Sequence, residues 1–562
     1  MIKKQNTYDA IVVGSGITGG WAAKELCEKG LKTLVLERGR NVNHVIDYQT
    51  TNMAPWDFIH RGRETQDDIE NQPIQSTTYA FNEGTKQFFV NDKENPYSTP
   101  KDKPFRWIRG YQVGGRSLIW GRQSYRLGVI DFEANAREGI EIDWPIRYKD
   151  IAPWYDYVES FAGISGQAEG LPQLPDGVFQ PPMEMYCVEK KVKDAIEKNW
   201  SDRMLTIGRT ANLTRPLHGR GACQYRDLCN RGCPYGAYFS SNSSTLPAAN
   251  ATGNLTLRPN SIAVTLIFDE KTGKASGIRI LDSETSETIE YFAKVIFLCA
   301  STLGTTWLLL HSKSQYFPDG FGNSSGVLGH YLMDHHFQVY SIAEFDDLDD
   351  NYYYGSRPNG IYVPRFRNIK EKHPDFLRGY GMQGGGYRVG WGYGNDQTGF
   401  GASFKNSLMS PGPWRMNLHA FGECLPYYDN KVELNPNVTD KWGLPTLTII
   451  CEFKENEYAM RKDMAQTTYE MLESAGGKNV ETHYGPDIPG FGIHEMGTAR
   501  MGKDPKTSVL NKYNQMHDAV NVFVTDGSCM TSSACQNPSL TYMALTTRAA
   551  NYAVDQLKKG NL

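Results

Sequence analysis

The stretch that decides the fold is YDAIVVGSGITGGWAAKELCEKGLKTLVLE, residues 8–37. Residues 8–13 (YDAIVV) predict a buried strand, and residues 18–29 predict a helix with small residues on one face. Gly30 ends that helix, and residues 32–36 predict the next strand. A strand–helix–strand unit of this length indicates a parallel, doubly wound sheet, so we expect an α/β protein.

Three glycines occupy the turn between this first strand and first helix. Gly14, Gly16 and Gly19 form G-x-G-x-x-G, and Glu37 ends the second strand. The first glycine allows a tight turn, the second allows a pyrophosphate to approach the backbone, and the third allows close helix–strand packing. The helix N-terminus would face the phosphates, and Glu37 would accept hydrogen bonds from ribose hydroxyls. The pattern predicts dinucleotide binding without separating FAD from NAD.

The size and charge of the chain limit the classes of protein it can belong to. Its 562 residues exceed the roughly 250–300 that one hydrophobic core supports, which favours two domains. A net charge of −4 gives no field that would gather nucleic acid or an anionic membrane, so we expect neither as a partner. No apolar run approaches the roughly 18 residues of a membrane span, and the N-terminus leads directly into a strand. We therefore expect no membrane span and no export signal on this chain.

Later segments alternate between sequence that predicts strands and helices in turn and sequence that is rich in aromatic residues and glycine. Residues 294–300 predict a central strand and residues 302–311 a helix, and a further strand and helix are expected at residues 520–525 and 540–557. Alternating aromatic residues at positions 379–394 predict strands of a separate sheet. Polar, proline-rich residues 48–104 are interpreted as a long surface excursion or lid.

Five ordered motifs resemble those of one enzyme family. They are GYQVGGRSLIWGRQSYR (residues 110–126), VIFLCASTLGTTWLLLHS (295–312), VLGHYLMDHH (327–336), HEMGTARMG (494–502) and VFVTDGSCMTSSACQNPSLTYMALTTRAA (522–550). Together they resemble the glucose-methanol-choline (GMC) oxidoreductases, and the resemblance extends over nearly the whole chain. It implies that the dinucleotide is FAD.

The resemblance also implies how the domains are arranged. The fold would be a Rossmann-like FAD-binding domain, similar to that of p-hydroxybenzoate hydroxylase, interwoven with a substrate domain made of an antiparallel β-sheet plus helices. We expect the discontinuous FAD-binding domain to comprise most of residues 1–336 together with residues 493–562. The substrate domain would comprise residues 337–492, with parts of 48–104 and 150–250 that include a cysteine-rich loop.

The resemblance assigns cofactor contacts along the chain. Asp526 lies where the family binds the ribityl chain, and Pro538 to Thr541 opens the last helix beneath the isoalloxazine ring, where the helix dipole stabilises negative charge. Ile119 stands where one branch of the family has a histidine joined covalently to its flavin, so we expect non-covalent FAD. The expected cofactor residues are Gly14, Gly16, Gly19, Glu37, Arg38, Gly114, Gly115, Ser117, Trp120, Gly121, Ala300, Asp526, Asn537, Pro538 and Thr541.

Oxidation of an alcohol by hydride transfer requires a base for the hydroxyl proton, a partner that orients the same oxygen, and an electron sink. His494, in H-x-x-G-T, matches the family's catalytic histidine, and Asn537, in N-P-x-x-T, matches its hydrogen-bonding partner. Gln383 and His419 are candidates for substrate contact, although a packed sheet explains them equally well. His335 and its neighbour His336 are expected to pack near the adenosine side of the cofactor or at a domain seam.

Three cysteines lie close together in CQYRDLCNRGCPYGA. Cys223, Cys229 and Cys233 are separated by five and three residues, and a proline follows the last. Thiolates gathered in a short loop are typical of iron–sulfur sites, and the spacing is similar to that of bacterial FAD-dependent sugar dehydrogenases, which hold a [3Fe-4S] cluster there. Three reduced cysteines in a packed loop are the alternative. A cluster would pass electrons singly to an external acceptor, a cytochrome or a quinone.

The expected function follows from the resemblance. Among these sugar enzymes the chain resembles the large subunit of bacterial glucoside 3-dehydrogenases, which act at C3 of glucose units in glycosides and disaccharides. Such subunits often pair with a small subunit that carries the export signal, which would give a periplasmic location; the cytoplasm is the alternative. An oxygen-using sugar oxidase similar to pyranose oxidase and a noncatalytic flavin-binding subunit remain the competing interpretations.

Overall fold

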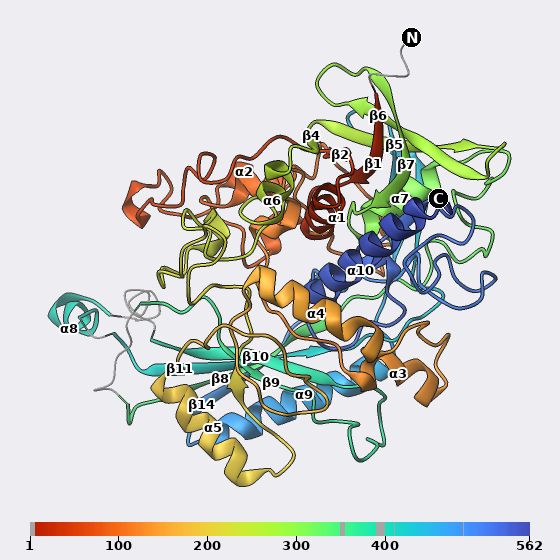
Figure 1. Ribbon diagram of the computed structural model, residues 1–562. Coiled ribbons are helices and arrows are strands. Elements are labelled where there is room, and N and C mark those ends of the chain that lie inside the picture. Colours follow the sequence, from red (N-terminus) through yellow and green to blue (C-terminus); the bar gives the residue numbers. More distant parts are fainter. Residues whose placement is uncertain (1–5, 349–354, 389–398, 410, 487) are drawn as a thin grey trace.

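In the computed structural model, the strand β7 (Thr288–Leu298) lies at the centre of a seven-stranded sheet (Figure 1). β1 (Thr7–Val13) pairs with β7 in parallel, and β2 (Thr33–Leu36) and β4 (Leu255–Arg258) extend the parallel part beyond β1. On its other side β7 pairs in parallel with β15 (Val522–Val524) and antiparallel with the strands β6 (Lys274–Asp282) and then β5 (Ser261–Asp269). The structure describes residues 6–348, 355–388, 399–409, 411–486 and 488–562.

Helices cover this sheet because the strands β1, β2 and β15 are buried along most of their length. α1 (Ile17–Glu28) packs against α6 (Thr245–Ala251) and α10 (Ser539–Lys558), and α10 in turn packs against α4 (Tyr148–Ala162). The third glycine of the motif explains how α1 fits: a Cβ atom at Gly19 would lie 1.9 Å from the Gly14 carbonyl oxygen. The helix can approach the strand this closely only without a side chain there.

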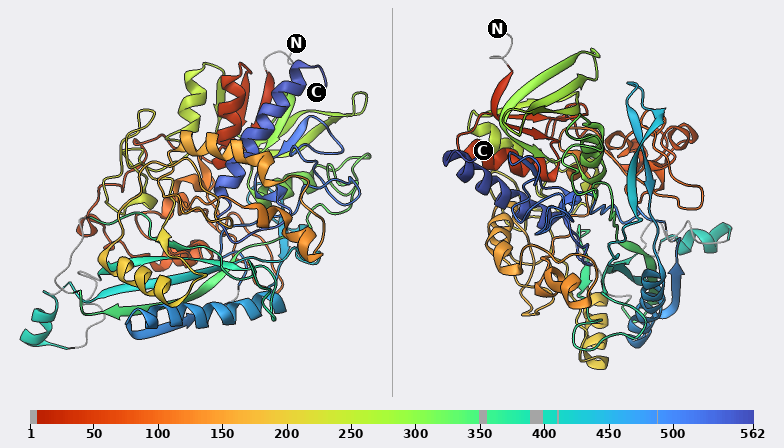
Figure 2. Two further views of the ribbon diagram at one scale, coloured as in Figure 1. Left: turned by 60° about the horizontal axis from the view of Figure 1, so that its bottom comes forward. Right: turned by 90° about the vertical axis from the view of Figure 1, so that its right-hand side faces the viewer.

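A second sheet is antiparallel throughout and has six strands. Their order is β14 (Lys478–Tyr484), β8 (His336–Phe345), β11 (Trp414–Gly422), β10 (Tyr380–Arg388), β9 (Ile361–Val363) and β3 (Thr206–Ile207). Alternate residues of β11, from Trp414 to Ala420, are buried in a core shared with α5 (Cys187–Asn199) and α9 (Glu455–Ser474). Figure 2 shows α9 lying along this sheet. The opposite face of this sheet is not covered by these helices and can line a site.

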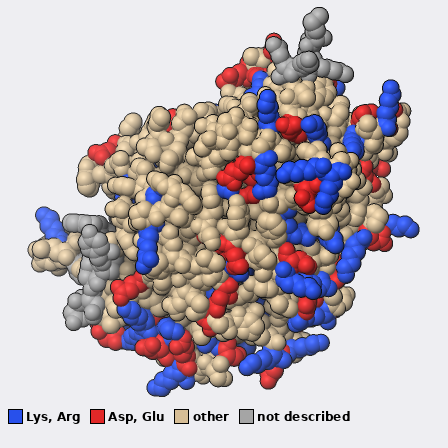
Figure 3. Space-filling view, in the orientation of Figure 1, with Lys and Arg blue, Asp and Glu red and all other residues tan. Residues whose placement is uncertain are grey.

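The remaining elements are short or lie outside the two sheets. Among the described residues they are α2 (Gln66–Asn71), α3 (Val129–Glu138), α7 (Thr302–His311), α8 (Gly401–Ser407) and the hairpin of β12 (Lys431–Thr439) and β13 (Pro445–Ile450), with several single 3₁₀ turns. Charged side chains of both signs are interspersed over much of the face in Figure 3. No helix in the described ranges combines the length and the apolar character that crossing a membrane requires.

The expected fold class, a Rossmann-like domain interwoven with an antiparallel sheet plus helices, is confirmed. The helix at residues 302–311 has the predicted bounds, and the aromatic segment forms β10 as far as Arg388; residues 389–394 of that prediction lie outside the described residues. The interpretation of residues 48–104 as a surface excursion is only partly right, because Phe81, Phe88 and Phe89 are buried in a small core. The domain boundaries stay a prediction.

Candidate active site

One large cavity, of about 1270 Å³, extends from the glycine turn to the free face of the antiparallel sheet. Its walls include the turn after β1, the 3₁₀ turn Gly115–Leu118 and the residues that open α10. The sheet contributes Gln383 from β10 and His419 from β11, which are direct cross-strand neighbours. Segments far apart in the sequence thus enclose a single space that can hold an extended cofactor and a substrate.

The glycine turn leaves room for a ligand at the N-terminus of α1. A Cβ atom built at Gly16, the residue that caps this helix, meets no described atom within 4 Å. The space in front of free helix N–H groups suits a phosphate. Glu37 lies beside it and accepts hydrogen bonds from the Ser15 backbone N–H (3.1 Å), the Ser15 hydroxyl (2.6 Å) and the Gly39 N–H (3.0 Å). A carboxylate has about four acceptor sites, so one remains for a ribose hydroxyl.

Most of the predicted cofactor residues line this cavity, and three do not. Those that line it are Gly14, Gly16, Glu37, Arg38, Gly115, Ser117, Trp120, Gly121, Ala300, Asp526, Asn537 and Pro538. Gly19 is buried against Gly14, and the N–H of Gly114 donates to the Ser15 hydroxyl at 2.9 Å. The Thr541 hydroxyl bonds the Tyr155 hydroxyl at 2.7 Å inside the core. These three residues therefore hold the wall of the cavity and do not form its surface.

The two predicted catalytic residues face each other in the cavity. The amide nitrogen of Asn537 lies 3.4 Å from Nε2 of His494. The side chain of Gln383 donates from Nε2 to Oδ1 of Asn537 at 2.6 Å. Gln383, predicted to contact substrate, thus has a protein partner that also fixes which side of the Asn537 amide turns toward His494. Its contact with substrate stays a prediction.

His335 is a neighbour of His494 that the sequence analysis did not connect with it. The two Nδ1 atoms lie 3.0 Å apart, and the ring planes are nearly perpendicular. His335 thus lies beside the predicted catalytic histidine, and its expected place near the adenosine side of the cofactor or at a domain seam stays a prediction. The bridge between Met333 and Met496 brings the two segments together, and such long-range pairing leaves no local pattern in the sequence. His336 points elsewhere, with its ring packed against Gly422 and Phe453.

The surroundings keep His494 neutral. Burial, the neighbouring His335 and the Arg116 guanidinium together hold the pKa of His494 well below its usual 6.5. Arg116 is itself held in a two-pronged ion pair with Glu495, at 3.1 and 2.8 Å. A neutral imidazole in a cavity that also contains an amide donor can accept a proton from a hydroxyl group.

Three stacked rings form part of the wall that the antiparallel sheet contributes. Tyr340 lies between His419 and His483, with ring centroids 4.3 and 4.6 Å apart respectively. Burial lowers the pKa of His419 to about 4, so this ring is neutral in the ordinary pH range. The stack presents a mixed apolar and hydrogen-bonding surface, which suits the C–H faces and hydroxyls of a polyol. Among these residues the sequence interpretation had singled out His419 alone.

The cysteine loop lies beside the large cavity. Cys223, Cys229 and Cys233 are half-buried free thiols that line one pocket of about 20 Å³. Asp227 and Asn230 of the same loop line the large cavity. Within the described ranges, however, no group of three His, Cys, Asp or Glu residues is arranged to hold a metal ion. The [3Fe-4S] cluster therefore stays a prediction.

Comparisons with known proteins agree with this architecture. Two family models described as GMC oxidoreductase match residues 8–337 and 426–546. A 2-methyl-1,2-propanediol dehydrogenase from Mycolicibacterium austroafricanum is 31% identical, with 98% of this chain and 96% of that protein aligned. The fructose dehydrogenase large subunit of Gluconobacter japonicus is 24% identical, with 98% of each chain aligned.

Solved structures support the fold. Formate oxidase from Aspergillus oryzae RIB40 has a TM-score of 0.61 at 14% identity, with 99% of both chains covered. Pyridoxine 4-oxidase from Mesorbium loti has a TM-score of 0.59 at 15% identity, with 97% of this chain and 99% of that chain covered. At these identities the likeness concerns the fold alone.

Two glycine substitutions should separate folding from cofactor binding. Gly19→Ala should lower the melting temperature of the protein even without FAD, because its Cβ atom would overlap the Gly14 carbonyl. Gly16→Ala should leave the apoprotein's melting temperature unchanged and reduce the flavin retained after gel filtration, because its Cβ atom fills only the ligand space. Differential scanning fluorimetry and flavin absorbance check both. Equal flavin retention by Gly16→Ala and the wild type would contradict this assignment.

Proposed function

The chain belongs to the GMC oxidoreductase family, and from that premise we propose that it is an FAD-dependent dehydrogenase of sugars. It oxidises a secondary hydroxyl, at C3, of glucose, glucosides or disaccharides to a keto-sugar. The observation that carries the proposal is the pairing of His494 with Asn537 inside a cavity that also contains the dinucleotide turn. This pairing also argues against a noncatalytic flavin-binding subunit.

The residues of the cavity fit FAD. Gly16 leaves open space at the N-terminus of α1, Glu37 keeps one acceptor site, and α10 begins at the cavity wall. The N-terminal end of α10 would stabilise negative charge on the reduced ring. Ile119 lines the cavity where a covalent histidine would otherwise stand, which supports non-covalent binding. Bound FAD supplies the electron sink that takes a hydride from the carbinol carbon.

His494 and Asn537 then divide the work on the hydroxyl group. Nε2 of His494 accepts the hydroxyl proton, and the Asn537 amide donates a hydrogen bond to the same oxygen. The carbinol thereby loses one hydride and one proton and becomes a carbonyl. Gln383 supports this arrangement because its hydrogen bond to Oδ1 of Asn537 keeps the amide N–H groups turned toward His494.

The choice of a sugar rests on the cavity wall and on relatives. The stack of Tyr340 with His419 and His483 offers the faces that a pyranose ring needs. Relatives named fructose dehydrogenase large subunit and gluconate 2-dehydrogenase flavoprotein, the latter from Pantoea cypripedii, support a polyhydroxylated substrate. The relative named for 2-methyl-1,2-propanediol favours a second candidate, a dehydrogenase of small diols.

The electrons must leave the reduced FAD for an acceptor. We propose an external one-electron acceptor, a cytochrome or a quinone, and a [3Fe-4S] cluster held by Cys223, Cys229 and Cys233. The thiols' spacing, their shared pocket and the position of Asp227 between that pocket and the large cavity support the loop as an electron exit. A small subunit that carries the export signal would take the enzyme to the periplasm; without such a partner it would act in the cytoplasm.

A substrate panel tests the main proposal. D-glucose, methyl glucosides, sucrose and 2-methyl-1,2-propanediol are mixed anaerobically with the holoenzyme, and bleaching of the flavin is followed by stopped flow. We expect the glucosides and sucrose to reduce the flavin fastest and the NMR spectrum of the product to show a carbonyl at C3. Faster reduction by the diol would favour the second candidate. In a separate aerobic assay, oxygen consumption as fast as the reduction of a dye acceptor would favour a sugar oxidase.

Removal of the imidazole tests the base. His494→Ala should slow flavin reduction by roughly 10²- to 10⁴-fold, the usual contribution of a general base, while FAD stays bound. In the wild type the reduction rate should stay constant from pH 8 to pH 6.5 and fall only at lower pH, because the base must be neutral and its pKa lies below 6.5. The control is His517→Ala, because His517 does not line the cavity. A rate that falls already above pH 7 would contradict the assignment.

Iron and acid-labile sulfide assays on anaerobically purified protein test the cysteine loop. We expect both elements in the wild type and their loss in Cys229→Ser, since thiolates are the ligands of such clusters. Cys187→Ser, outside the loop, is the matched control and should retain both. A wild-type protein without either element would mean that the three cysteines are reduced thiols in a packed loop.

A further inference from the structure

We propose that His335 is a positioning residue that fixes the tautomer of His494, so that Nε2 of His494, the nitrogen facing the substrate, carries no proton. The proposal deepens the proposed function by explaining how the base is kept ready. It rests on the geometry of a chain of buried hydrogen bonds. It assigns to His335 a role in the reaction that the sequence motif alone does not indicate.

The argument begins at the far end of this chain of hydrogen bonds. Nε2 of His335 lies 2.8 Å from the carbonyl oxygen of Ala534. A carbonyl can only accept a hydrogen bond, so Nε2 of His335 must carry a proton. A neutral imidazole carries one proton, which leaves a lone pair on Nδ1 of His335. That lone pair meets Nδ1 of His494 at 3.0 Å, so Nδ1 of His494 must be the donor.

The neutrality of His335 follows from its surroundings. The His335 ring is buried, and its two ring nitrogens contact the His494 ring and the main-chain carbonyl oxygen of Ala534. Burial lowers the pKa of His335 to about 4. The adjacent carboxylate of Asp334 is already occupied, because it accepts the backbone N–H groups of Gly490, Gly492 and His494 at 2.7 to 2.9 Å. Asp334 thus holds the main chain of His494 while His335 holds its ring.

The near end of the chain of hydrogen bonds has the same polarity. With its proton on Nδ1, His494 presents a lone pair at Nε2, which faces the donating amide of Asn537 at 3.4 Å. Asn537 has that orientation because Gln383 donates to its oxygen. Every donor from Gln383 to Ala534 therefore meets an acceptor. Reversing His494 alone would bring two lone pairs together at Nδ1 and two donors together at Nε2.

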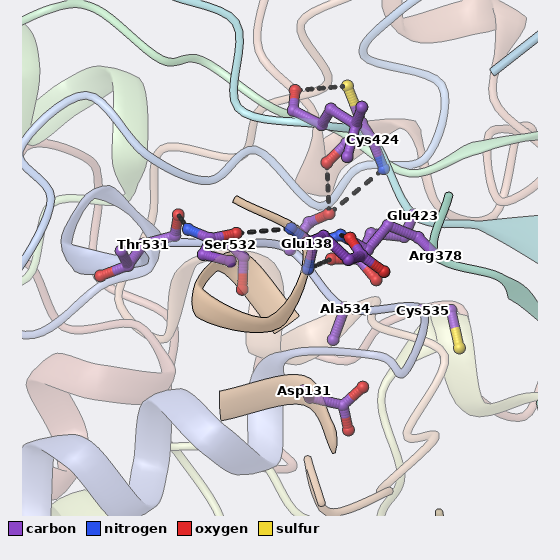
Figure 4. A network of polar contacts seen from close by, with 12 residues as sticks. Asp131, Glu138, Arg378, Glu423, Cys424, Thr531, Ser532, Ala534 and Cys535 are labelled. Carbon is purple, nitrogen blue, oxygen red and sulfur yellow. Dashed lines mark hydrogen bonds and ion pairs between the residues drawn. The ribbon is translucent and has the colours of Figure 1, made fainter. Parts of the chain in front are cut away.

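The loop that carries Ala534 is held by a buried polar network (Figure 4). Arg378 is fully buried, pairs with Glu138 and Glu423, and donates to Oδ1 of Asn135 at 2.6 Å. Asn135 donates to the Thr531 carbonyl, and Ser533 exchanges hydrogen bonds with the backbone of Cys424. On the other side of Ala534, Gln536 donates to Asp131 at 3.0 Å. The loop that ends at Asn537 is therefore fixed on both sides of Ala534, and the acceptor for His335 has a defined position.

Two substitutions of His335 separate this role from mere packing. In His335→Asn an amide oxygen can occupy the place of Nδ1, which keeps the acceptor for His494 and loses the bond to Ala534. In His335→Gln an amide nitrogen can occupy the place of Nε2, which keeps the bond to Ala534 and loses that acceptor. A structural role predicts that the Gln variant is the milder change. A tautomer role predicts the reverse.

Flavin reduction by the most active panel substrate is measured for both holoenzymes at pH 7.5. We expect His335→Asn to reduce the rate by less than about 5-fold and His335→Gln by roughly 10- to 100-fold, the usual effect of losing a residue that orients a functional histidine. Flavin content and melting temperature show whether each variant folds, and His517→Gln is the matched control. Equal rates in the two variants, or the reverse order, would overturn the proposal.

A second measurement needs no substrate. In holoenzyme labelled with ring-¹⁵N histidine, the signals of His494 are identified by their loss in His494→Ala. We expect its proton on Nδ1 in the wild type and in His335→Asn, and on Nε2 in a large fraction of His335→Gln. A wild-type proton on Nε2 would overturn the inference. A panel without any active substrate would refute the proposed function and leave this result unaffected.

Discussion

The pairing of β7 with strands from both ends of the chain is the constraint on which the site depends. β1 pairs with β7 on one side, and β15 pairs with residues 296–298 on the other. Because these three strands are parallel, their carboxyl ends lie at one edge of the sheet. The Gly14 turn and Asp526, which follow β1 and β15, therefore open onto one cavity. α10 begins soon after β15, which brings Asn537 to the same place.

The interior of the site allows little freedom in its hydrogen bonds. A buried donor or acceptor without a partner costs about 1–3 kcal/mol, so a chain of buried polar groups tends to keep one polarity. Arg116 adds a positive charge that disfavours the charged form of His494, and Glu495 holds that guanidinium in place. Burial and charge thus act in the same direction and keep the imidazole neutral.

Much of the fold could be predicted from the sequence because its signals are local. The spacing of Gly14, Gly16 and Gly19 requires only a strand, a turn and a helix, and α7 has the bounds that its apolar run predicts. The contact of His335 with His494 joins residues 159 positions apart, and no periodicity reports such a contact. The spacing of Cys223, Cys229 and Cys233 likewise fixes their order along the loop without fixing the directions of their side chains.

The two sheets divide specificity from reactivity, but not completely. Tyr340 and His483 line the cavity and are not members of the chain of hydrogen bonds that extends from Gln383 to Ala534. Their replacement can therefore change the shape of the cavity alone. Gln383 belongs to the same sheet and yet orients Asn537. A change at Gln383 therefore alters both functions at once. One fold can then serve relatives named for a diol, fructose and gluconate, provided that variation avoids the residues that hold His494 and Asn537, the proposed base and its partner.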